Sequence, residues 1–298
     1  EIRNCDWSSD VCSSDLGTIA GKTYGDAAFS LGATASSGLA VSYASTTTGV
    51  CTVSGSTLTI VSNGTCSITA SQAGDVNWLA ATDVSQSFTV SQKGLTVSGT
   101  TASNKTYDRT VTATPNFGSS TLVGKVGSDD VTLVTAGGTA AFADKTVATG
   151  KTVTISGLVL GGTTASRYSL TQPTTTASIT AATLTVNGIT SNNKTYDGLA
   201  SATSLLNTGS ASLSGVIGAD AVTLVTGSAT GTFPDKNVGT GRTVTIAGLT
   251  LTGTDAANYS LTQPTTTASI TAKGLTVSGV TANDKTYDRT ATATLNTG

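Results

Sequence analysis

The chain has 298 residues, a formal net charge of −2, no histidine and no methionine, and it is dominated by Thr, Ser, Gly, Ala and Val. A near-neutral chain offers no electrostatic footprint for nucleic acid or anionic lipid, and no apolar run approaches the roughly 18 residues of a membrane span. Without histidine, the commonest general base and metal ligand is missing. We therefore expect no enzyme activity, no catalytic residue, no cofactor and no metal site.

Residues 1–16 are expected to lie outside the native fold. Residues 6–16, Asp-Trp-Ser-Ser-Asp-Val-Cys-Ser-Ser-Asp-Leu, resemble one translated frame of a short-read sequencing adapter. Foreign segments have to be set aside before a fold is considered. The alternative is a genuine Cys- and Ser-rich N-terminal loop, which a long genomic read across this segment would distinguish.

Residues 17–92 show the pattern of a first β domain. Apolar residues fall on every second position within three short segments, and Gly, Ser and Asn separate the segments. Period-two alternation between such breakers is typical of strands with one buried face. The alternating residues are Cys51 and Val53, then Leu58 and Ile60, then Cys66, Ile68 and Ala70.

Cys51 and Cys66 are the only cysteines after residue 16. Two cysteines without histidine make a poor zinc site, and their spacing is not that of a redox motif. A structural disulfide in an oxidising compartment is one interpretation, and it would stabilise the domain by about 3 kcal/mol. Two free buried thiols are the other.

The remainder of the chain repeats itself with a period of about 90 residues. Lys-Thr-Tyr-Asp occurs at residues 105–108, 194–197 and 285–288, and residues 169–180 recur unchanged at residues 260–271. This pattern predicts one repeat at residues 93–181, a second at 182–272, and the truncated start of a third at 273–298. A unit of this length is large enough for a core of its own.

The predicted fold class is all-β. Thr and Val favour the pleated surface of a strand, and Gly and Ser favour turns. We expect tandem Ig-like or β-sandwich domains in an elongated, monomeric array. Almost no linker separates the repeats, and such junctions bend less than a Gly/Ser tether.

The repeated Lys-Thr-Tyr-Asp phrase is the most distinctive candidate site. In one interpretation the tyrosines form a repeated ligand platform. In the interpretation we favour, each is a structural turn in which the tyrosine ring packs, its hydroxyl bonds to backbone, and the aspartate caps the turn. The turn residues are Tyr107, Asp108, Tyr196, Asp197, Tyr287 and Asp288.

Two other groups of polar residues suggest weaker hypotheses. Asp129, Asp130 and Asp144 could hold calcium, but Ala221 replaces Asp130 in the second repeat, which argues against a shared site. The Thr-rich residues 174–176 and 265–267 could form a hydroxyl face for ice or glycan. Solvent-facing strand threonines explain them more simply.

Four phrases of the repeats resemble the YDG-type repeats of large secreted bacterial proteins: Tyr-Asp near the start, Gly-x-Asp-x-Val-Thr-Leu, Phe-x-Asp-Lys, and Tyr-Ser-Leu-Thr-Gln-Pro before a terminal strand. Residues 17–92, with Tyr24-Gly25-Asp26, are similar to the MBG-type or bacterial Ig-like modules found beside them. The resemblance to haemagglutinin-like adhesins of Gram-negative bacteria implies export, display at the outer membrane and tandem β domains. It brings no catalytic residues.

The expected function is a structural stalk of a secreted or surface-exposed adhesin, non-catalytic, whose parent protein binds an unknown host-surface or matrix ligand. The alternative is that the domains themselves bind glycan or matrix protein through exposed loops. An enzyme would need catalytic residues elsewhere in a longer protein, of which this chain looks like a fragment.

Overall fold

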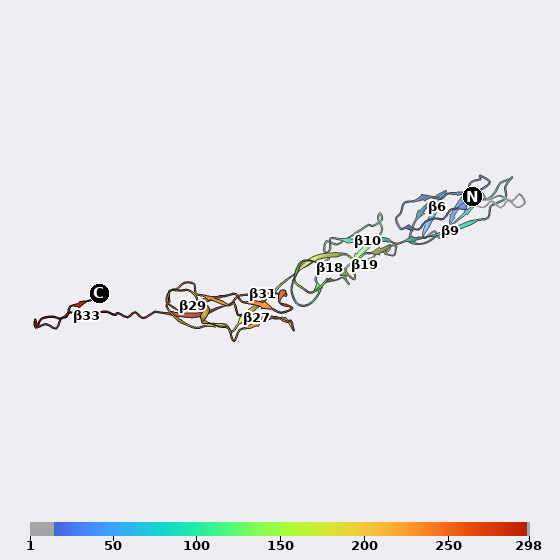
Figure 1. The fold of residues 1–298 in the computed structure, drawn as a ribbon. Helices are drawn as coiled ribbons and strands as arrows, with labels where there is room; N and C mark the ends of the chain where they lie inside the picture. Colours follow the sequence, from blue (N-terminus) through green and yellow to red (C-terminus); the bar gives the residue numbers. More distant parts are fainter. Residues whose placement is uncertain (1–14, 297–298) are drawn as a thin grey trace. The chain divides into compact units, whose positions relative to one another are not determined.

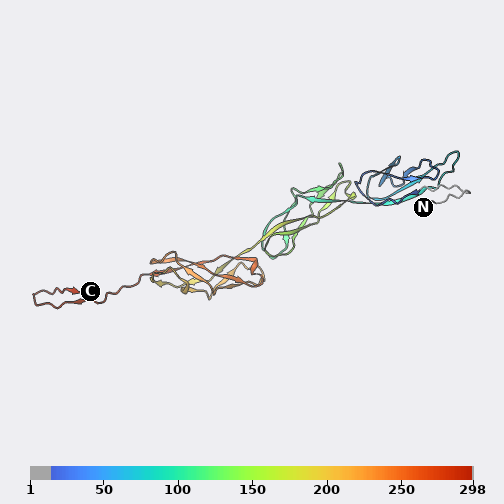
Figure 2. The same cartoon turned by 45° about the horizontal axis from the view of Figure 1, so that its top comes forward.

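The computed structural model describes residues 15–296, and within them every regular element is a strand except three short 3-10 segments, η1 (Ala165–Arg167), η2 (Thr203–Leu205) and η3 (Ala256–Asn258). Both views show extended ribbons joined by tight turns (Figures 1 and 2). The protein is all-β and consists of tandem β-sandwich domains, as the alternation predicts. Among the described residues, no helix has the length and apolarity to cross a membrane.

The chain divides into two compact units. One contains the first domain and most of the first repeat. The other contains residues 180–298 together with the short turn Thr106–Arg109, which the sequence assigns to the first repeat. Residues 106–109 of the first repeat therefore pack with the second repeat.

The first domain has two main sheets. In the first the strand order is β2-β9-β8-β5, and in the second it is β3-β7-β6. Their bounds are β2 (Lys22–Thr23), β9 (Val84–Ser91), β8 (Gly64–Ser71), β5 (Ser42–Ser45), β3 (Phe29–Ser30), β7 (Thr57–Ile60) and β6 (Cys51–Ser54). Strand β8 buries Cys66, Ile68 and Ala70 on one face, so the predicted alternation sets the core.

A disulfide joins the two sheets of the first domain. It connects Cys51 of β6 to Cys66 of β8, with 5.7 Å between the Cα atoms, and both residues are fully buried. Because the bond lies inside the core, it fixes the distance between the sheet layers.

The first domain begins earlier than the sequence suggested. Strand β1 (Asp15–Leu16) pairs with β4 (Ala33–Thr34), and Leu16 is buried. The expected boundary after Leu16 is therefore two residues too late, because the apolar Leu16 side chain has a sheet edge to pack against. Residues 1–14, which include most of the adapter-like segment, lie outside the described residues.

The first repeat contains a three-stranded sheet ordered β15-β10-β20, a five-stranded sheet ordered β12-β21-β18-β17-β13, and two two-stranded sheets, β11-β14 and β16-β19. The bounds are β10 (Lys93–Ser98), β15 (Thr121–Val123), β20 (Tyr168–Leu170), β12 (Lys105–Thr106), β21 (Thr174–Thr180), β18 (Ala148–Ser156), β17 (Thr139–Phe142), β13 (Thr112–Ala113), β11 (Thr101–Ala102), β14 (Pro115–Asn116), β16 (Thr132–Val134) and β19 (Val159–Gly161).

The second repeat reproduces this plan. Its sheets are ordered β26-β22-β31, β24-β32-β29-β28, β27-β30 and β23-β25. The bounds are β26 (Ser212–Ser214), β22 (Ala182–Asn187), β31 (Tyr259–Leu261), β24 (Lys194–Thr195), β32 (Thr265–Thr271), β29 (Gly239–Ala247), β28 (Thr230–Thr232), β27 (Thr223–Val225), β30 (Thr250–Thr252), β23 (Thr190–Ser191) and β25 (Leu206–Asn207).

A glycine ends the first strand of each repeat for a steric reason. Gly99 and Gly188 have φ angles of 79° and 82°. A Cβ there would lie 2.1 Å from the carbonyl oxygen of Ser119 or Ser210. Only glycine tolerates both the positive φ and the close backbone approach.

Consecutive domains are joined with almost no linker. Only Gln92 separates β9 from β10, and only Ala181 separates β21 from β22. The start of the third repeat forms just one small hairpin, β33 (Thr281–Ala282) with β34 (Leu295–Asn296). Its last two residues, 297 and 298, lie outside the described residues.

Replacing both cysteines of the disulfide, as Cys51→Ala/Cys66→Ala, is expected to lower the free energy of unfolding of the first domain by about 3 kcal/mol, because the bond closes a 15-residue separation. Denaturant titration would measure this loss. Non-reducing peptide mapping of the native protein should recover the Cys51 and Cys66 peptides linked. Recovery of both as free thiols would contradict the structure.

Candidate functional site

The Lys-Thr-Tyr-Asp turn is held together by its own side chains. In the second repeat, Asp197 Oδ1 accepts hydrogen bonds from the Leu199 amide at 2.9 Å and from Lys194 Nζ at 2.8 Å. Lys194 Nζ also donates to the Leu199 and Ser201 carbonyl oxygens. The aspartate therefore caps the turn, and the lysine stabilises it by donating to two backbone carbonyl oxygens.

The same local bonds form at the start of the third repeat. Lys285 Nζ donates to Asp288 Oδ1, and the Thr290 amide donates to the same oxygen at 2.9 Å. The surrounding residues there are exposed. The turn is thus encoded locally, because it forms without the rest of a domain around it.

Residues 22–26, Lys-Thr-Tyr-Gly-Asp, are the counterpart of this turn in the first domain, and the tyrosines of this segment and of the first repeat contact the following domain. At the first junction, Tyr24 Oη donates to Asp129 Oδ2 of the first repeat at 2.7 Å. Tyr168 Oη donates to the same oxygen and accepts the Val126 amide at 3.0 Å. The two rings meet edge to face with centroids 5.5 Å apart, and Arg167 Nη1 donates to Tyr24 Oη at 3.0 Å. One carboxylate is therefore shared by tyrosines of two successive domains.

The second junction repeats the arrangement inside the second unit. Tyr107 Oη donates to Asp220 Oδ2 at 2.9 Å, and Tyr259 Oη donates to the same oxygen at 2.7 Å. Tyr259 Oη accepts the Ile217 amide at 3.0 Å, and the ring centroids are again 5.5 Å apart. Arg109 Nε lies 2.8 Å from Asp220 Oδ1.

These contacts correct the sequence-based interpretation of Tyr107. Its hydroxyl does not bond to backbone but donates to a carboxylate of the next domain. The backbone contact is made instead by the second tyrosine of each junction, Tyr168 or Tyr259. The reason is geometric, because the turn lies at the end of its own domain and its ring faces outward.

The two later copies of the tyrosine have no such neighbour. Tyr196 is half-buried, and within residues 15–296 its hydroxyl makes no hydrogen bond; Tyr287 is 86% exposed. The same residue type is therefore buried at the two junctions, half-buried at the Tyr196 turn and exposed at the Tyr287 turn. Burial follows the presence of a following domain, not the turn itself.

The shared carboxylates of the junctions are mostly buried. Asp220 and Asp129 side chains are only 1% and 15% exposed. Burial raises the pKa of Tyr107 to about 12, and its hydrogen bond to Asp220 adds to this; burial and Asp129 likewise raise the pKa of Tyr168 to about 12. Hydrogen bonds from Tyr168 and Tyr24 outweigh desolvation and lower the pKa of Asp129. The first junction thus favours two neutral phenols around one ionised carboxylate.

The first junction also joins two hydrophobic cores. One continuous buried cluster contains Tyr24 and Cys66 of the first domain together with Leu95, Val131 and Tyr168 of the first repeat. The expectation that each domain seals its own core is therefore wrong at this boundary. The tyrosine ring bridges the two cores because a linker of one residue leaves the domain ends in contact.

The aspartates considered for calcium have separate structural roles. Asp129 belongs to the first junction, and Asp144 pairs with Lys151. Asp130 accepts the Thr163 amide at 2.9 Å; in the second repeat Ala221 occupies its place, and Asp255 accepts the Ala221 amide instead. Among the described residues, no three potential metal ligands lie together.

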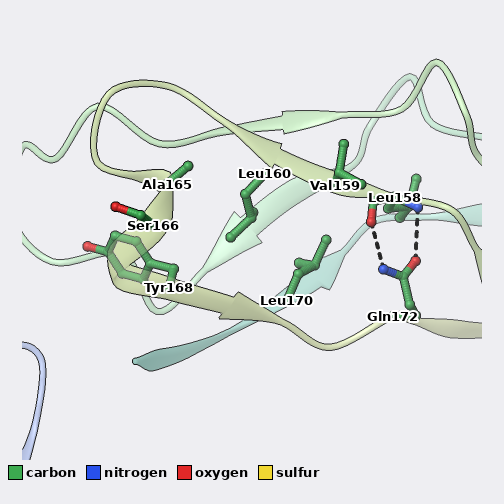
Figure 3. Close-up of a pocket in the computed structure, with 8 residues that line it drawn as sticks. All are labelled: Leu158, Val159, Leu160, Ala165, Ser166, Tyr168, Leu170 and Gln172. Atoms are coloured by element: carbon green, nitrogen blue, oxygen red, sulfur yellow. Dashed lines mark hydrogen bonds between the residues drawn. The ribbon is translucent and has the colours of Figure 1, made fainter. Parts of the chain in front are cut away.

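Two further motifs prove structural. Gln172 holds the edge of the first repeat, because its Oε1 accepts the Leu158 amide at 3.1 Å and its Nε2 donates to the Leu158 carbonyl at 2.7 Å (Figure 3). Gln263 and Leu249 form the same pair of hydrogen bonds in the second repeat.

The phenylalanine of the Phe-x-Asp-Lys phrase packs under the lysine of the turn. Lys105 Nζ lies 5.7 Å from the centre of the Phe142 ring, and Lys194 Nζ lies 5.8 Å from the centre of the Phe233 ring.

A hollow of about 420 Å³ lies beside Gln172, between β19 and β20. Figure 3 shows Leu160 and Leu170 turned toward each other across it, with Tyr168 at one end. No charged side chain lines it. It offers apolar surface but no convergent set of polar groups to orient a ligand.

Comparison with known proteins identifies the repeats. The YDG domain family matches residues 91–177 and 180–268. These ranges contain both junction aspartates and both Tyr-Ser-Leu tyrosines. No curated protein matches the chain.

Solved structures show only remote likeness. Drosophila N-cadherin EC1-4 is 10% identical over 88% of this chain and 74% of that one, with a TM-score of 0.25. SGBP-B of the Bacteroides ovatus mixed-linkage glucan utilization locus, solved in complex with a mixed-linkage heptasaccharide, is 12% identical over 86% of this chain and 67% of that one, with a TM-score of 0.21. Surface layer protein SbsC, domains 1-6, is 13% identical over 78% and 36%, with a TM-score of 0.19. At these scores the description of the fold rests on this chain's own strands.

Removing the junction hydroxyl in Tyr107→Phe is expected to lower the free energy of unfolding by about 1–2 kcal/mol, because Asp220 loses a donor in a buried setting. Tyr196→Phe is the matched control, since its hydroxyl has no partner in the described part of the chain, and it should change stability by less than about 0.5 kcal/mol. Chemical denaturation measures both. Equal losses in the two variants would remove the junction role of Tyr107.

Stability is expected to fall between about pH 10 and pH 12. The pKa of Tyr107 and Tyr168 is raised from 10.0 to about 12 in the folded protein. The folded state therefore holds these protons more tightly, so the stabilisation is complete below pH 10 and is lost as pH rises toward 12. Ultraviolet titration of the native protein should show two phenols ionising last, and Tyr107→Phe should remove one of them. Ionisation of all tyrosines near pH 10 without unfolding would contradict this.

Proposed function

We propose that this chain, which belongs to the YDG domain family, is a non-catalytic structural stalk of a secreted or surface-exposed bacterial adhesin. The observation that supports this most is the repeated junction, in which a tyrosine of one domain and a tyrosine of the next share one aspartate. The hydrogen bonds of these four tyrosines and two aspartates serve to join one domain to the next.

Such junctions restrict motion between neighbours. Relative movement is the usual behaviour of domains with small polar interfaces. Here the one-residue linkers, the edge-to-face rings and the shared carboxylate oppose it together. Bending a junction would expose the hydrogen bonds of its carboxylate to solvent and separate its two edge-to-face tyrosine rings. A spacer that has to transmit position or force benefits from this resistance.

The non-catalytic assignment is supported by what the ionisable groups do. The sequence lacks histidine, and the buried aspartates at the junctions already accept structural hydrogen bonds. At the first junction the two phenols lower the pKa of Asp129, so this carboxylate is held in its ionised form by structural hydrogen bonds. Its chemistry suits a fixed contact better than acid–base catalysis.

The proposed location is the extracellular surface of a Gram-negative bacterium, associated with the outer membrane. The disulfide between Cys51 and Cys66 supports an oxidising compartment. The resemblance to haemagglutinin-like adhesins supports surface display. The ligand of the parent protein, on a host surface or in the matrix, would bind outside the repeats.

One observation favours a second candidate function, binding of glycan or matrix protein by the first domain. The loop between β8 and β9 carries Val76, Trp78 and Leu79 with 99%, 38% and 76% of their surface exposed. Asp75 fixes the loop by accepting the Asn77 and Trp78 amides. An indole presented on a tight loop is suited to stack on a sugar ring or on a partner's apolar surface.

An array of glycans and extracellular-matrix proteins, probed with the intact chain and with Trp78→Ala, tests the proposal. The stalk assignment predicts no saturable binding by either protein. Saturable binding that Trp78→Ala abolishes would overturn it in favour of the exposed loop. Binding that Trp78→Ala leaves intact would also overturn it and would place the contact in another loop.

A further inference from the structure

At each junction one arginine lies beside the shared carboxylate. The following domain supplies this arginine at the first junction, and the preceding domain supplies it at the second. At the first junction it is Arg167, which belongs to the following domain and directly precedes Tyr168. At the second junction it is Arg109, which belongs to the preceding turn and lies two residues after Tyr107. Two copies of one interface thus satisfy the same charge in two different ways.

At the first junction the turn of the preceding domain has no arginine after its tyrosine. Residues 25–27, directly after Tyr24, are Gly-Asp-Ala. Arg167 instead reaches back from η1, with Nη1 3.6 Å from Asp129 Oδ1 and its guanidinium 5.3 Å from the centre of the Tyr24 ring. The side chain therefore contacts both partners of the junction.

At the second junction the position of Arg167 is taken by Asn258, which is buried and uncharged. Arg109 supplies the cation from the other side, at a turn position with a positive φ in each repeat: 68° at Arg109, 81° at Gly198 and 62° at Arg289. Its guanidinium occupies the space beside Gly218, where a Cβ would lie 2.2 Å from Arg109 Nη1. The equivalent Gly127 at the first junction has open space there. The two interfaces are therefore shaped for their different arginines.

We propose that this reciprocal supply of one arginine determines which domain can follow which. A turn with arginine two residues after its tyrosine fits a domain with asparagine before Tyr-Ser-Leu. A turn without it fits a domain with arginine there. Two arginines would crowd like charges at one carboxylate, and none would leave a mostly buried carboxylate without its cation. The Tyr196 turn, with Gly198 in the place of Arg109, accordingly fits a domain that carries Arg-Tyr-Ser-Leu.

Three variants of the intact chain test the rule. Arg109→Gly removes the cation of the second junction, Arg167→Asn removes that of the first, and Arg109→Gly/Asn258→Arg moves the second junction's arginine to the other side. The readouts are the hydrogen-exchange rates of the Ile217 and Val126 amides, which donate to the junction tyrosines Tyr259 and Tyr168.

Arg109→Gly is expected to speed exchange of the Ile217 amide about fivefold and leave Val126 unchanged, and Arg167→Asn should do the reverse. The double variant should return Ile217 to within about twofold of the original chain. Arg289→Gly is the matched control: Arg289 has the same sequence context and a φ of 62°, and its turn has no following domain within the described residues. It should change neither amide.

The proposal is overturned if Arg109→Gly has no effect on Ile217, or if the folded double variant exchanges as fast as Arg109→Gly alone. The double variant places a long side chain at a buried position, so it requires a separate check of folding by its amide spectrum. If it does not fold, the two single variants decide. Effects that are not confined to their own junctions would then reject the rule.

Discussion

A carboxylate shared by two tyrosines from successive domains is the interaction on which the rest of this structure depends. Burying a carboxylate is costly unless hydrogen-bond donors and a cation surround it. Asp129 and Asp220 each receive two phenol hydroxyls and one arginine, and neither domain provides this set alone. The interface is therefore complete only when both domains are in place, which makes the boundary a specific contact and not a passive tether.

The fold of each repeat serves this contact. The Lys-Thr-Tyr-Asp turn projects a tyrosine from the end of one domain, and its lysine and aspartate hold the turn with bonds made within a few residues. The Tyr-Ser-Leu segment places the second tyrosine in a strand that pairs in parallel with the first strand of the same repeat. Since that first strand follows the preceding domain after one residue, both tyrosines reach the same boundary.

Much of the architecture could be predicted from the sequence, whereas the partners at the junctions could not. Alternation around Cys66 and Ile68 indicated a half-buried strand, and the recurring phrases indicated repeated domains. Tyr107 and Asp220, however, are 113 residues apart, and a periodic sequence offers an equivalent aspartate in every repeat. Nothing in the period says whether a turn contacts its own domain or the next. The one available signal lay in two sequence positions. The turn that carries Arg109 precedes a repeat with Asn258 before Tyr-Ser-Leu, and the turn without arginine precedes a repeat with Arg167 at that position.

The sequence alone determined the local features of this protein: strand positions, turns closed by their own lysine and aspartate, the glycines that end strands, and the length of a domain. These depend on interactions between residues that are close in the chain or on simple alternation. The tertiary structure decided which carboxylate each tyrosine meets, which side supplies the arginine, and that buried contacts continue from one domain into the next. Those outcomes depend on how the ends of two folded domains fit together, and this geometry exists only after both have formed.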